Sequence, residues 1–410
     1  MPPPRAPVLR LLRDASAALA GRAAAEDAAM LHAMTTLLAE LIAEDSMAET
    51  VPTSPAAEQA RWAEIDALAL AERTPAAGDQ AADEALPHDQ LAAFLNREVA
   101  GEGAVSVTAS RTVARGNSKK TMLVDLAGNR VLPDRIALRI DRRGNYIDTE
   151  VVDEFPVFQL LWANGARIPQ PFAVEPTGEL TGEPFIVVAA ATGAPVGGNY
   201  VSPPRDEALV ADVALCLARI HATPLDAWPR PDQPQGPAFI DAEIAEYRAD
   251  YEAMGEYSPI MDAAFAWIAA NQAQAYGPPA LVHNDFNFNN LLVEGSRISA
   301  VLDWEFAHVG TAAADLGFFY YSAENVSSFA DFLGAYAAAG GTVPPKAQLD
   351  FYILWGQLRL AVLGFKAVRA FDAGESPDIR FGIARWHRRH GLLRLAALLP
   401  QLADGGIAHP

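Results

Sequence analysis

Cysteine is almost absent from this chain of 410 residues, in which Cys216 is the only one. A single thiol excludes an internal disulfide framework and a zinc site built from several cysteines. The segment around it, VALCLARIHA, has the composition of a buried helix. The fold therefore depends on a hydrophobic core, which a chain of this length with 51% hydrophobic residues can supply.

Long uninterrupted apolar runs are also missing. The sequence has no stretch of about 18 consecutive apolar residues, the length that a membrane-spanning helix needs. Near the N-terminus, Arg10 and Arg13 interrupt the apolar core that a signal peptide would require. We therefore expect a cytoplasmic protein with no membrane partner.

Positive charge is scarce, because 31 basic residues face 51 acidic ones and the net charge is -20. Duplex nucleic acid needs a basic face, so we expect no nucleic-acid partner. The basic residues that are present gather late in the chain, between Arg359 and Arg394. Such a patch on an acidic protein favours an anionic ligand, and a solvated helix face is the alternative.

The first 85 residues have the pattern of helices. Met30, Met34, Leu37 and Leu41 recur at helical spacing, and an alanine-rich, acidic linker with glycine and proline follows. We place a domain boundary near Leu86. The helical N-terminal extension, 1–85, is expected to pack against the rest of the protein or to join two copies into a homodimer.

The pattern changes after this boundary. Segments 104–113 and 120–128 alternate as the strands of a hairpin do, and the short segments RIALRI and GEPFIVVAAATG indicate further strands. Residues 152–165 indicate a helix between them. After Pro203 the chain is mostly helical, apart from one strand–loop–strand unit.

That unit contains a polar segment, HNDFNFNN at 283–290, between two apolar pairs that we expect to lie in buried strands. Asparagine and aspartate are common in turns, so a hairpin would account for part of this composition. A second aspartate, Asp303, ends the next apolar strand. Carboxylates and a carboxamide at the ends of adjacent strands suit a divalent metal and a phosphate.

Phosphoryl transfer from ATP requires this combination of groups. A carboxylate has to orient and deprotonate the acceptor hydroxyl, and oxygen ligands have to hold the magnesium that bridges the phosphates. Asp285 can serve as the first, and Asn290 and Asp303 as the second.

The segment LVHNDFNFNNLLVEGSRISAVLDWEFAHVGTAAADLGFFY resembles the catalytic core of the aminoglycoside phosphotransferase/choline kinase superfamily. Within that superfamily it is most similar to the kinase-like domains associated with acyl-CoA dehydrogenases. The resemblance implies an α+β, protein-kinase-like bilobal fold. It places a small antiparallel N-lobe at 86–192, and a helical C-lobe with the catalytic loop and the acceptor site at 193–402.

The resemblance also implies residue roles. Asp285 would be the catalytic base, Asn290 and Asp303 would bind magnesium, and His283 would be a structural member of the loop. Asp315 would brace the loop through backbone hydrogen bonds. The register from His283 and Asp285 selects Asn290 rather than its neighbour, Asn289, as the ligand.

In the small lobe, the segment RGNSKKT resembles the phosphate-covering turn of the family. A glycine permits close backbone approach there. We expect nucleotide contacts from Gly116, Ser118 and Lys119, although a surface lysine pair is the alternative for Lys119 and Lys120. At the position of the kinase lysine stands Arg139, whose expected partner is Glu154, and the hinge around Val188 and Ala190 would hold adenine.

We therefore expect a Mg2+-dependent kinase that uses ATP, with GTP as the alternative donor, to phosphorylate a hydroxyl group of a small molecule. The basic residues Arg385, Arg388 and Arg389 favour an anionic acceptor such as a hydroxyacyl-CoA or hydroxy acid. An aminoglycoside-type antibiotic phosphotransferase is an alternative, because such enzymes bind cationic sugars through acidic loops. A catalytically silent kinase-like binding protein and a metal-dependent hydrolase are two further alternatives.

Overall fold

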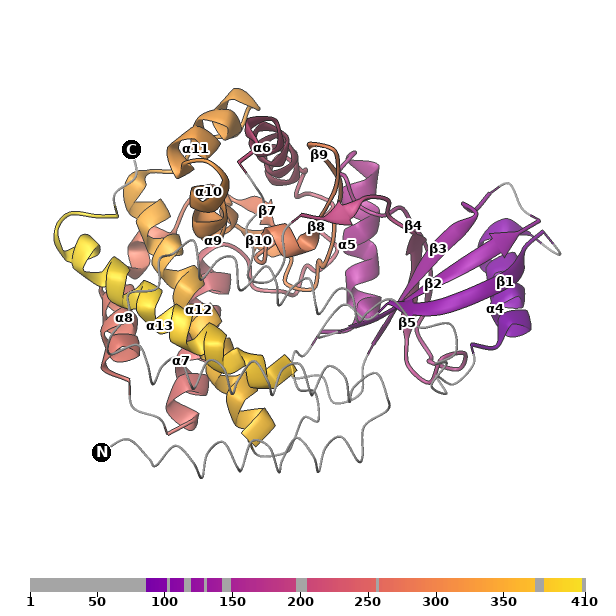
Figure 1. Cartoon of the computed structure of the whole chain (residues 1–410), viewed down its shortest axis with the longest axis horizontal. Helices are drawn as coiled ribbons and strands as arrows, with labels where there is room; N and C mark the ends of the chain where they lie inside the picture. The colour runs from indigo at the N-terminus through magenta and orange to yellow at the C-terminus, as the bar shows by residue number, and fades with distance from the viewer. Residues whose placement is uncertain are drawn as a thin grey trace, which may run out of the picture. The chain divides into compact units, whose positions relative to one another are not determined.

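The computed structural model describes residues 86–101, 104–113, 119–128, 131–141, 149–196, 205–255, 258–372 and 380–407. Pro87–Val196 and Ser202–Pro410 form one compact unit, which contains a five-stranded sheet and a larger helical region (Figure 1). Met1–Leu86 and Gly197–Val201 form the other unit. The predicted helices of 1–85 lie outside the described residues.

An antiparallel five-stranded sheet forms the small lobe, with the strand order β1-β2-β3-β5-β4. The strands are β1 (Ser106–Val113), β2 (Lys119–Ala127), β3 (Arg135–Asp141), β4 (Pro171–Glu175) and β5 (Phe185–Ala189). The lobe also contains α4 (His88–Leu95), the π-helical turn η1 (Asn96–Ala100) and α5 (Val151–Ala163). The predicted small antiparallel sheet with one helix is therefore confirmed, with β4 and α4 as elements that the sequence pattern did not indicate.

The large lobe is mostly helical, as predicted. Its helices are α6 (Glu207–His221), α7 (Pro237–Ala253), α8 (Pro259–Asn271), α9 (Ala312–Phe318), α10 (Tyr320–Val326), α11 (Phe329–Ala338), α12 (Lys346–Asp372) and α13 (Arg380–Ala403), with short turns η2 (Gln272–Ala275) and η3 (Phe288–Asn290). Local chemistry defines several starts. The side chains of Asp206, Ser258 and Ser328 accept hydrogen bonds from backbone N–H groups in the first turns of α6, α8 and α11.

The polar segment 283–290 joins two different small sheets. Before it, β7 (Ala280–Val282) pairs with β10 (His308–Gly310). After it, β8 (Leu291–Glu294) pairs with β9 (Arg297–Val301) and with β6 (Ala194–Pro195). A hairpin around this segment is therefore the wrong interpretation, because β7 and β8 are not partners. The N–H of Leu302, directly after β9, donates to the carbonyl of Asn290, directly before β8, at 2.8 Å, which continues the β8–β9 pairing into the polar segment.

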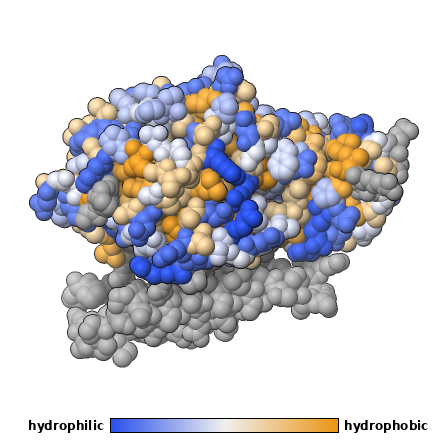
Figure 2. Space-filling view, turned by 90° about the horizontal axis from the view of Figure 1, so that it is seen from above, coloured by the Kyte–Doolittle hydropathy of each residue, from blue (hydrophilic) through white to orange (hydrophobic). Residues whose placement is uncertain are grey.

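The helix α12 is the longest apolar element of the large lobe. Residues Lys346–Ala370 are long and apolar enough to cross a membrane by length and composition. However, 83% of the apolar 18-residue window within this helix is buried inside the protein. The helix thus packs as part of the core. On the face shown in Figure 2, hydrophobic residues occupy small areas between hydrophilic ones.

Cys216 lies on α6 and is buried, as predicted from its segment. Burial raises the pKa of its thiol to about 12, because the surroundings disfavour the thiolate. The nearby guanidinium of Arg167 opposes this shift without cancelling it.

Candidate functional site

Two phenylalanines anchor the polar segment 283–290, which we call the catalytic loop. Phe286 and Phe288 are buried, and their ring centroids lie 5.5 and 5.2 Å from that of Phe319. Phe319 in turn packs on Phe332 of α11, at 4.9 Å. The two phenylalanines of HNDFNFNN thus enter the core, while the polar residues between and around them form the loop.

The carboxylate of Asp315, on α9, is hydrogen-bonded to the backbone of this loop. It accepts from the N–H of His283 at 2.8 Å and from the N–H of Asn284 at 2.7 Å. Asp315 has no exposed surface, and the ring of His221 lies 3.1 Å from its Oδ2. The hydrogen bonds of His221 and the backbone hold the pKa of Asp315 below its usual range, although burial alone would raise it.

His221 is a supporting residue that the sequence did not single out. Its Nδ1 lies 2.8 Å from the hydroxyl of Tyr336, so that α6 and α11 are joined to Asp315. The only signal in the sequence was a histidine at the end of an apolar helix. Such a histidine is common, and its partners are about 100 residues away along the chain.

His283 uses both ring nitrogens within the fold. Its Nδ1 accepts from the N–H of Asp285 at 3.2 Å, and its Nε2 lies 2.8 Å from the carbonyl of Leu302. The second contact requires a proton on Nε2, since a carbonyl can only accept. This geometry agrees with the structural position expected for His283, and it leaves neither nitrogen available to a metal.

Asp285 is half-buried, and neutral donors surround its carboxylate. The side-chain amide of Asn287 donates to Oδ1 at 2.9 Å, and that of Asn290 donates to Oδ2 at 2.8 Å. Burial raises the pKa of Asp285 to about 6, with the charge of Asp303 acting in the same direction and the amide of Asn290 opposing it. A general base works best when its pKa lies near the working pH, so this carboxylate is suited to accept a proton.

The two adjacent asparagines have different environments. Asn290 is only 9% exposed, and its Nδ2 contacts both the carboxylate and the carbonyl of Asp285. Its Oδ1 is therefore the atom that remains to ligate a cation. Asn289 is exposed, and its backbone N–H donates a hydrogen bond to Oδ1 of Asn287. The structure thus places Asn290, and not Asn289, beside Asp285.

Asn284 and Asp303 share an unusual backbone conformation. Among the described residues, they are the non-glycine residues with positive φ, at 63° and 67°. Asparagine and aspartate tolerate this region better than other residues, at a cost of roughly 1 kcal/mol. Such strain is often found at functional sites. Here one strained residue lies directly before Asp285, and the other is the predicted magnesium ligand.

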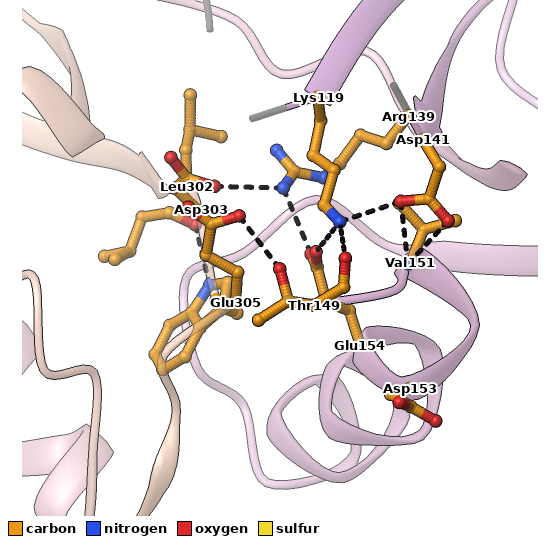
Figure 3. Close-up of polar contacts among 12 residues, drawn as sticks. Lys119, Arg139, Asp141, Thr149, Val151, Asp153, Glu154, Leu302, Asp303 and Glu305 are labelled. Carbon is orange, nitrogen blue, oxygen red and sulfur yellow. Dashed lines mark hydrogen bonds and ion pairs between the residues drawn. The ribbon is translucent and has the colours of Figure 1, made fainter. Parts of the chain in front are cut away.

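Asp303 also forms an ion pair with an arginine of the small lobe. Nη2 of Arg139, on β3, lies 3.0 Å from Oδ1 of Asp303 and 3.0 Å from Oε2 of Glu154 (Figure 3). The expected pair of Arg139 and Glu154 is therefore present, and it reaches the predicted metal ligand directly. Asp303 remains 28% exposed, whereas Glu154 on α5 has no exposed surface.

Lys119 was expected either to contact the nucleotide or to lie at the surface, and its environment in the structure differs from both. It is only 2% exposed, and its Nζ donates to Oδ1 of Asp141 at 2.7 Å and to the carbonyl of Thr149. The same Nζ lies 3.9 Å from Oε1 of Glu154 (Figure 3). Lys119 is thus no surface lysine, and its ammonium is held by carboxylates and a carbonyl. We call Lys119, Arg139, Asp141 and Glu154 the ion cluster.

The ion cluster also fixes the start of α5. The carboxylate of Asp141 accepts from the N–H of Val151, the first residue of the helix, at 3.2 Å. Burial raises the pKa of Glu154, while Arg139 and Lys119 counteract this effect. Both cations therefore help to keep Glu154 ionised.

The other predicted nucleotide contacts are only partly described. Gly116 and Ser118 lie outside the described residues. Val188 is a central residue of β5, paired with Ala137 on one side and Pro171 on the other. Ala190 follows the end of β5, and its N–H donates to the carbonyl of Arg135 at 3.3 Å. Val188 thus lies within the sheet, and Ala190 lies at the exit of the strand.

The predicted acceptor arginines lie on α13. The side chains of Arg385 and Arg389 lie outside the described residues. Arg388 is half-buried, and its guanidinium carbon lies 3.7 Å from the ring centroid of Phe365 on α12. Arg388 was expected to line an acceptor site, but in the structure it packs onto the neighbouring helix.

The donors at the loop fit a magnesium ion that relies on phosphate and water for part of its shell. Asn290 offers a carboxamide oxygen and Asp303 a carboxylate, both of which are oxygen ligands of the kind that Mg2+ prefers. No group of three or more His, Cys, Asp or Glu in the described part of the chain could hold a metal by itself. Mg2+ typically uses one or two protein ligands together with substrate phosphates.

Fold and site both agree with a known family. Residues 110–352, more than half of the chain, match the phosphotransferase enzyme family, and the chain belongs to it. The resemblance seen in the catalytic segment is thereby confirmed.

Two curated relatives illustrate this membership. Acyl-CoA dehydrogenase family member 11 of Gallus gallus is 23% identical over 287 residues, which are 63% of this chain and 36% of that protein. Viomycin phosphotransferase of Streptomyces vinaceus is 28% identical over 187 residues, 43% of this chain and 62% of that protein. The chain spans about a third of the length of the dehydrogenase relatives that it matches.

Solved structures show the same fold. A protein from Ralstonia eutropha described as an aminoglycoside phosphotransferase superposes with a TM-score of 0.59 at 19% identity, covering 75% of this chain and 98% of its own. A spectinomycin phosphotransferase in complex with ADP and spectinomycin has a TM-score of 0.51 at 14% identity, covering 76% and 98%. The kinase-like, bilobal α+β fold is thus confirmed.

Proposed function

We propose that this protein is a Mg2+-dependent kinase that transfers the γ-phosphate of ATP to a hydroxyl group of a small molecule. The observation that carries the proposal is the arrangement around the catalytic loop. A carboxylate with a pKa of about 6, Asp285, is hydrogen-bonded to Asn290, and Asp303 is bonded to Arg139 of the small lobe. Base, metal ligands and a phosphate-binding cation are thereby all represented in one fold.

Each side chain then has a defined task. Asp285 orients the acceptor hydroxyl and takes its proton as the new bond to phosphorus forms. Asn290 and Asp303 would hold Mg2+, which would supply neutralisation of the charge on the phosphates. Arg139 grips phosphate oxygens with the same guanidinium that now contacts Asp303, while Glu154 keeps it in place.

For the acceptor we propose a hydroxyacyl-CoA or a hydroxy acid. Relatives named as acyl-CoA dehydrogenase family members support this class, because an acyl-CoA enzyme and a hydroxyl kinase in one polypeptide could handle the same acyl chain. The number of basic residues in the sequence of α13 favours an anion as well. Phosphorylation would turn an unreactive hydroxyl into a leaving group for a later elimination.

A second candidate is phosphorylation of a cationic antibiotic. It is favoured by the similarity to viomycin phosphotransferase and by the net charge of -20. The remaining alternatives receive less support. A hydrolase that ligates metal through His283 conflicts with the hydrogen bonds of both ring nitrogens. A silent binding protein would not need the amides that hold Asp285 or the guanidinium that contacts Asp303.

Release of ADP from MgATP tests the proposal across four acceptor classes: hydroxyacyl-CoAs, hydroxy acids, aminoglycosides and choline-like alcohols. We expect the highest rate with an anionic acceptor. A highest rate with an aminoglycoside would select the second candidate. In a parallel thermal-shift measurement, stabilisation only by ATP and Mg2+ together supports a kinase. Stabilisation by metal alone would favour a hydrolase, and no stabilisation a silent protein.

A further inference from the structure

Asn284, the residue before Asp285, has every polar group paired with a charged side chain. Its backbone N–H donates to Oδ1 of Asp315 at 2.7 Å, and its side-chain Nδ2 donates to Oε1 of Glu243 at 3.0 Å. Its carbonyl accepts from Nη2 of Arg359 at 3.2 Å, and its Oδ1 accepts from Nη1 of the same guanidinium. Three helices, α7, α9 and α12, thus converge on one loop residue.

Arg359 is a buried charge, 4% exposed, in the middle of α12. Its Nε lies 3.5 Å from Oε1 of Glu243, and the indole N–H of Trp355 donates to Oε2 of the same carboxylate at 2.9 Å. The guanidinium carbon lies 5.8 Å from the ring centroid of Tyr247 and 5.9 Å from that of Phe318. Ionic partners and aromatic rings together fix the orientation of this side chain.

We propose that Arg359 is a positioning residue for phosphoryl transfer, which grips the side chain and the carbonyl of Asn284 and thereby sets the direction of Asp285. This inference rests on the proposed function. Arg359 acts on the position of Asp285 through Asn284, because its hydrogen bonds to the catalytic loop go to the side chain and the carbonyl of that residue.

The chemistry of the contact requires an arginine. A guanidinium is planar and presents several donors in a fixed fork, so that one side chain can bind two oxygens of the same residue. Arginine only donates and glutamate only accepts at neutral pH, so Arg359 and Glu243 also determine which way round the amide of Asn284 lies. The amide in turn holds a residue whose φ of 63° would otherwise relax.

The effect on Asp285 follows from the chain connection. On its far side, Asp285 is held by the amides of Asn287 and Asn290. On its near side, the peptide bond from Asn284 carries the carbonyl that Arg359 binds. A displacement of about 1 Å at a reacting group can lower a rate by roughly 10²-fold. Loss of the hydrogen bonds between Arg359 and Asn284 should therefore lower the turnover rate more than it weakens binding of the nucleotide.

The test compares Arg359→Met, Arg359→Lys and Asn284→Gly by steady-state kinetics, with the acceptor that gives the highest rate in the panel above. We expect kcat to fall about 10- to 100-fold in Arg359→Met, with KM for MgATP within about twofold of the wild type. Arg359→Lys keeps the charge but not the fork, so it should restore less than half of the loss on a logarithmic scale. In an Asn284→Gly background, Arg359→Met should lower kcat less than it does alone, because the side-chain contact is already gone and only the contact with the carbonyl remains to be lost.

Arg248→Met is the matched control. Arg248 also lies over an aromatic ring and pairs with a glutamate, Glu252, on the same helix as Glu243, but its side chain is 43% exposed. Its kcat should stay within twofold of the wild type. Wild-type kcat in folded Arg359→Met, or equal and additive losses in the Asn284→Gly background, would overturn the positioning role.

The proposed function fails in a different way. Absence of ADP release by the wild type with every acceptor would overturn both proposals at once, whereas an active wild type with unaffected variants would overturn only the role of Arg359. Thermal unfolding of each variant separates misfolding from misplacement. If Arg359→Met does not fold, Arg359→Lys carries the comparison, and wild-type kcat in that variant counts against the proposal.

Discussion

The catalytic loop and the ion cluster both fix carboxylates at the candidate site, but they use different donors. In the loop, the neutral amides of Asn287 and Asn290 surround Asp285. In the ion cluster, the cations Lys119 and Arg139 surround the carboxylates of Asp141 and Glu154. Neutral donors orient a carboxylate while leaving its pKa high enough to take up a proton. Cations favour the ionised form of a carboxylate.

This difference matches the tasks that we propose. A base has to change its protonation state in every cycle, and Asp285, with a pKa of about 6, is prepared to do so. Glu154 has to stay charged in order to hold Arg139, even though burial raises its pKa. The following experiments test this distinction, beginning with the largest expected effect.

Asp285→Asn should reduce kcat by about 10²- to 10⁴-fold, the range typical of the loss of a general base. The substitution keeps the size and polarity of the side chain, so that loop geometry is largely retained while proton acceptance is lost. Measurement of ADP release with the best acceptor checks this expectation. A loss below tenfold would show that Asp285 does not accept the proton.

Lys119→Met should lower the free energy of unfolding by about 3–5 kcal/mol, because it leaves the buried Glu154 and the half-buried Asp141 without one of their cations. Urea denaturation followed by circular dichroism measures this change. Arg97→Met is the control, since Arg97 pairs with Glu98 at the surface and such pairs contribute about 0–1 kcal/mol. Equal effects of the two substitutions would contradict the role of the ion cluster.

His308 offers a third way to bury an ionisable group, because it is kept neutral. Burial lowers its pKa to about 4, against 6.5 for an ordinary histidine. The unfolded state therefore binds this proton first as the pH falls, and stability should be lost between pH 6.5 and pH 4, by up to about 3 kcal/mol. His308→Phe, which preserves the stacking on Phe239 at 3.5 Å, should show a flatter pH dependence in urea denaturation. An unchanged slope would contradict this assignment.

The smallest expected effects distinguish the two adjacent asparagines. Asn290→Ala should lower kcat/KM about tenfold and raise the Mg2+ concentration needed for half-maximal activity, because a neutral ligand and a donor to Asp285 are lost. Asn289→Ala should leave both values within twofold, since Asn289 is exposed. The reverse ranking would mean that the ligand has been assigned to the wrong asparagine.

Much of the fold could be predicted from local pattern. Alternation identified β1 and β2, the short segments RIALRI and GEPFIVVAAATG identified β3 and β5, and the chain after Pro203 was correctly expected to be mostly helical. The short strand β4 was missed because it begins with a proline, which is rare inside strands. The pairing of β7 with β10 was missed as well, since 25 residues separate Val282 from His308 and no turn signal links the two segments.

The candidate site was predictable where its residues are close in sequence. The segment 283–290 and Asp303 have the spacing of a known family, and the pair of Arg139 and Glu154 followed from the same resemblance. Supporting residues from distant helices, such as His221, Glu243 and Arg359, carry no local signal. The burial of Lys119 was not predicted, because a lysine pair beside a turn is usually solvated. Its register opposite Asp141, at the end of β3, is the signal that could have revealed the buried pair.

The single buried thiol of Cys216 has a practical consequence for spectroscopy. Because burial raises its pKa to about 12, it should stay inert toward maleimide dyes in the folded protein. Cysteines introduced at exposed positions, for example at Glu98 in the small lobe and Asp404 in the large lobe, would then be the only sites to react. Paired fluorophores could therefore be attached without first removing a native residue, and their energy transfer would report any change in the distance between the two lobes when a nucleotide is added.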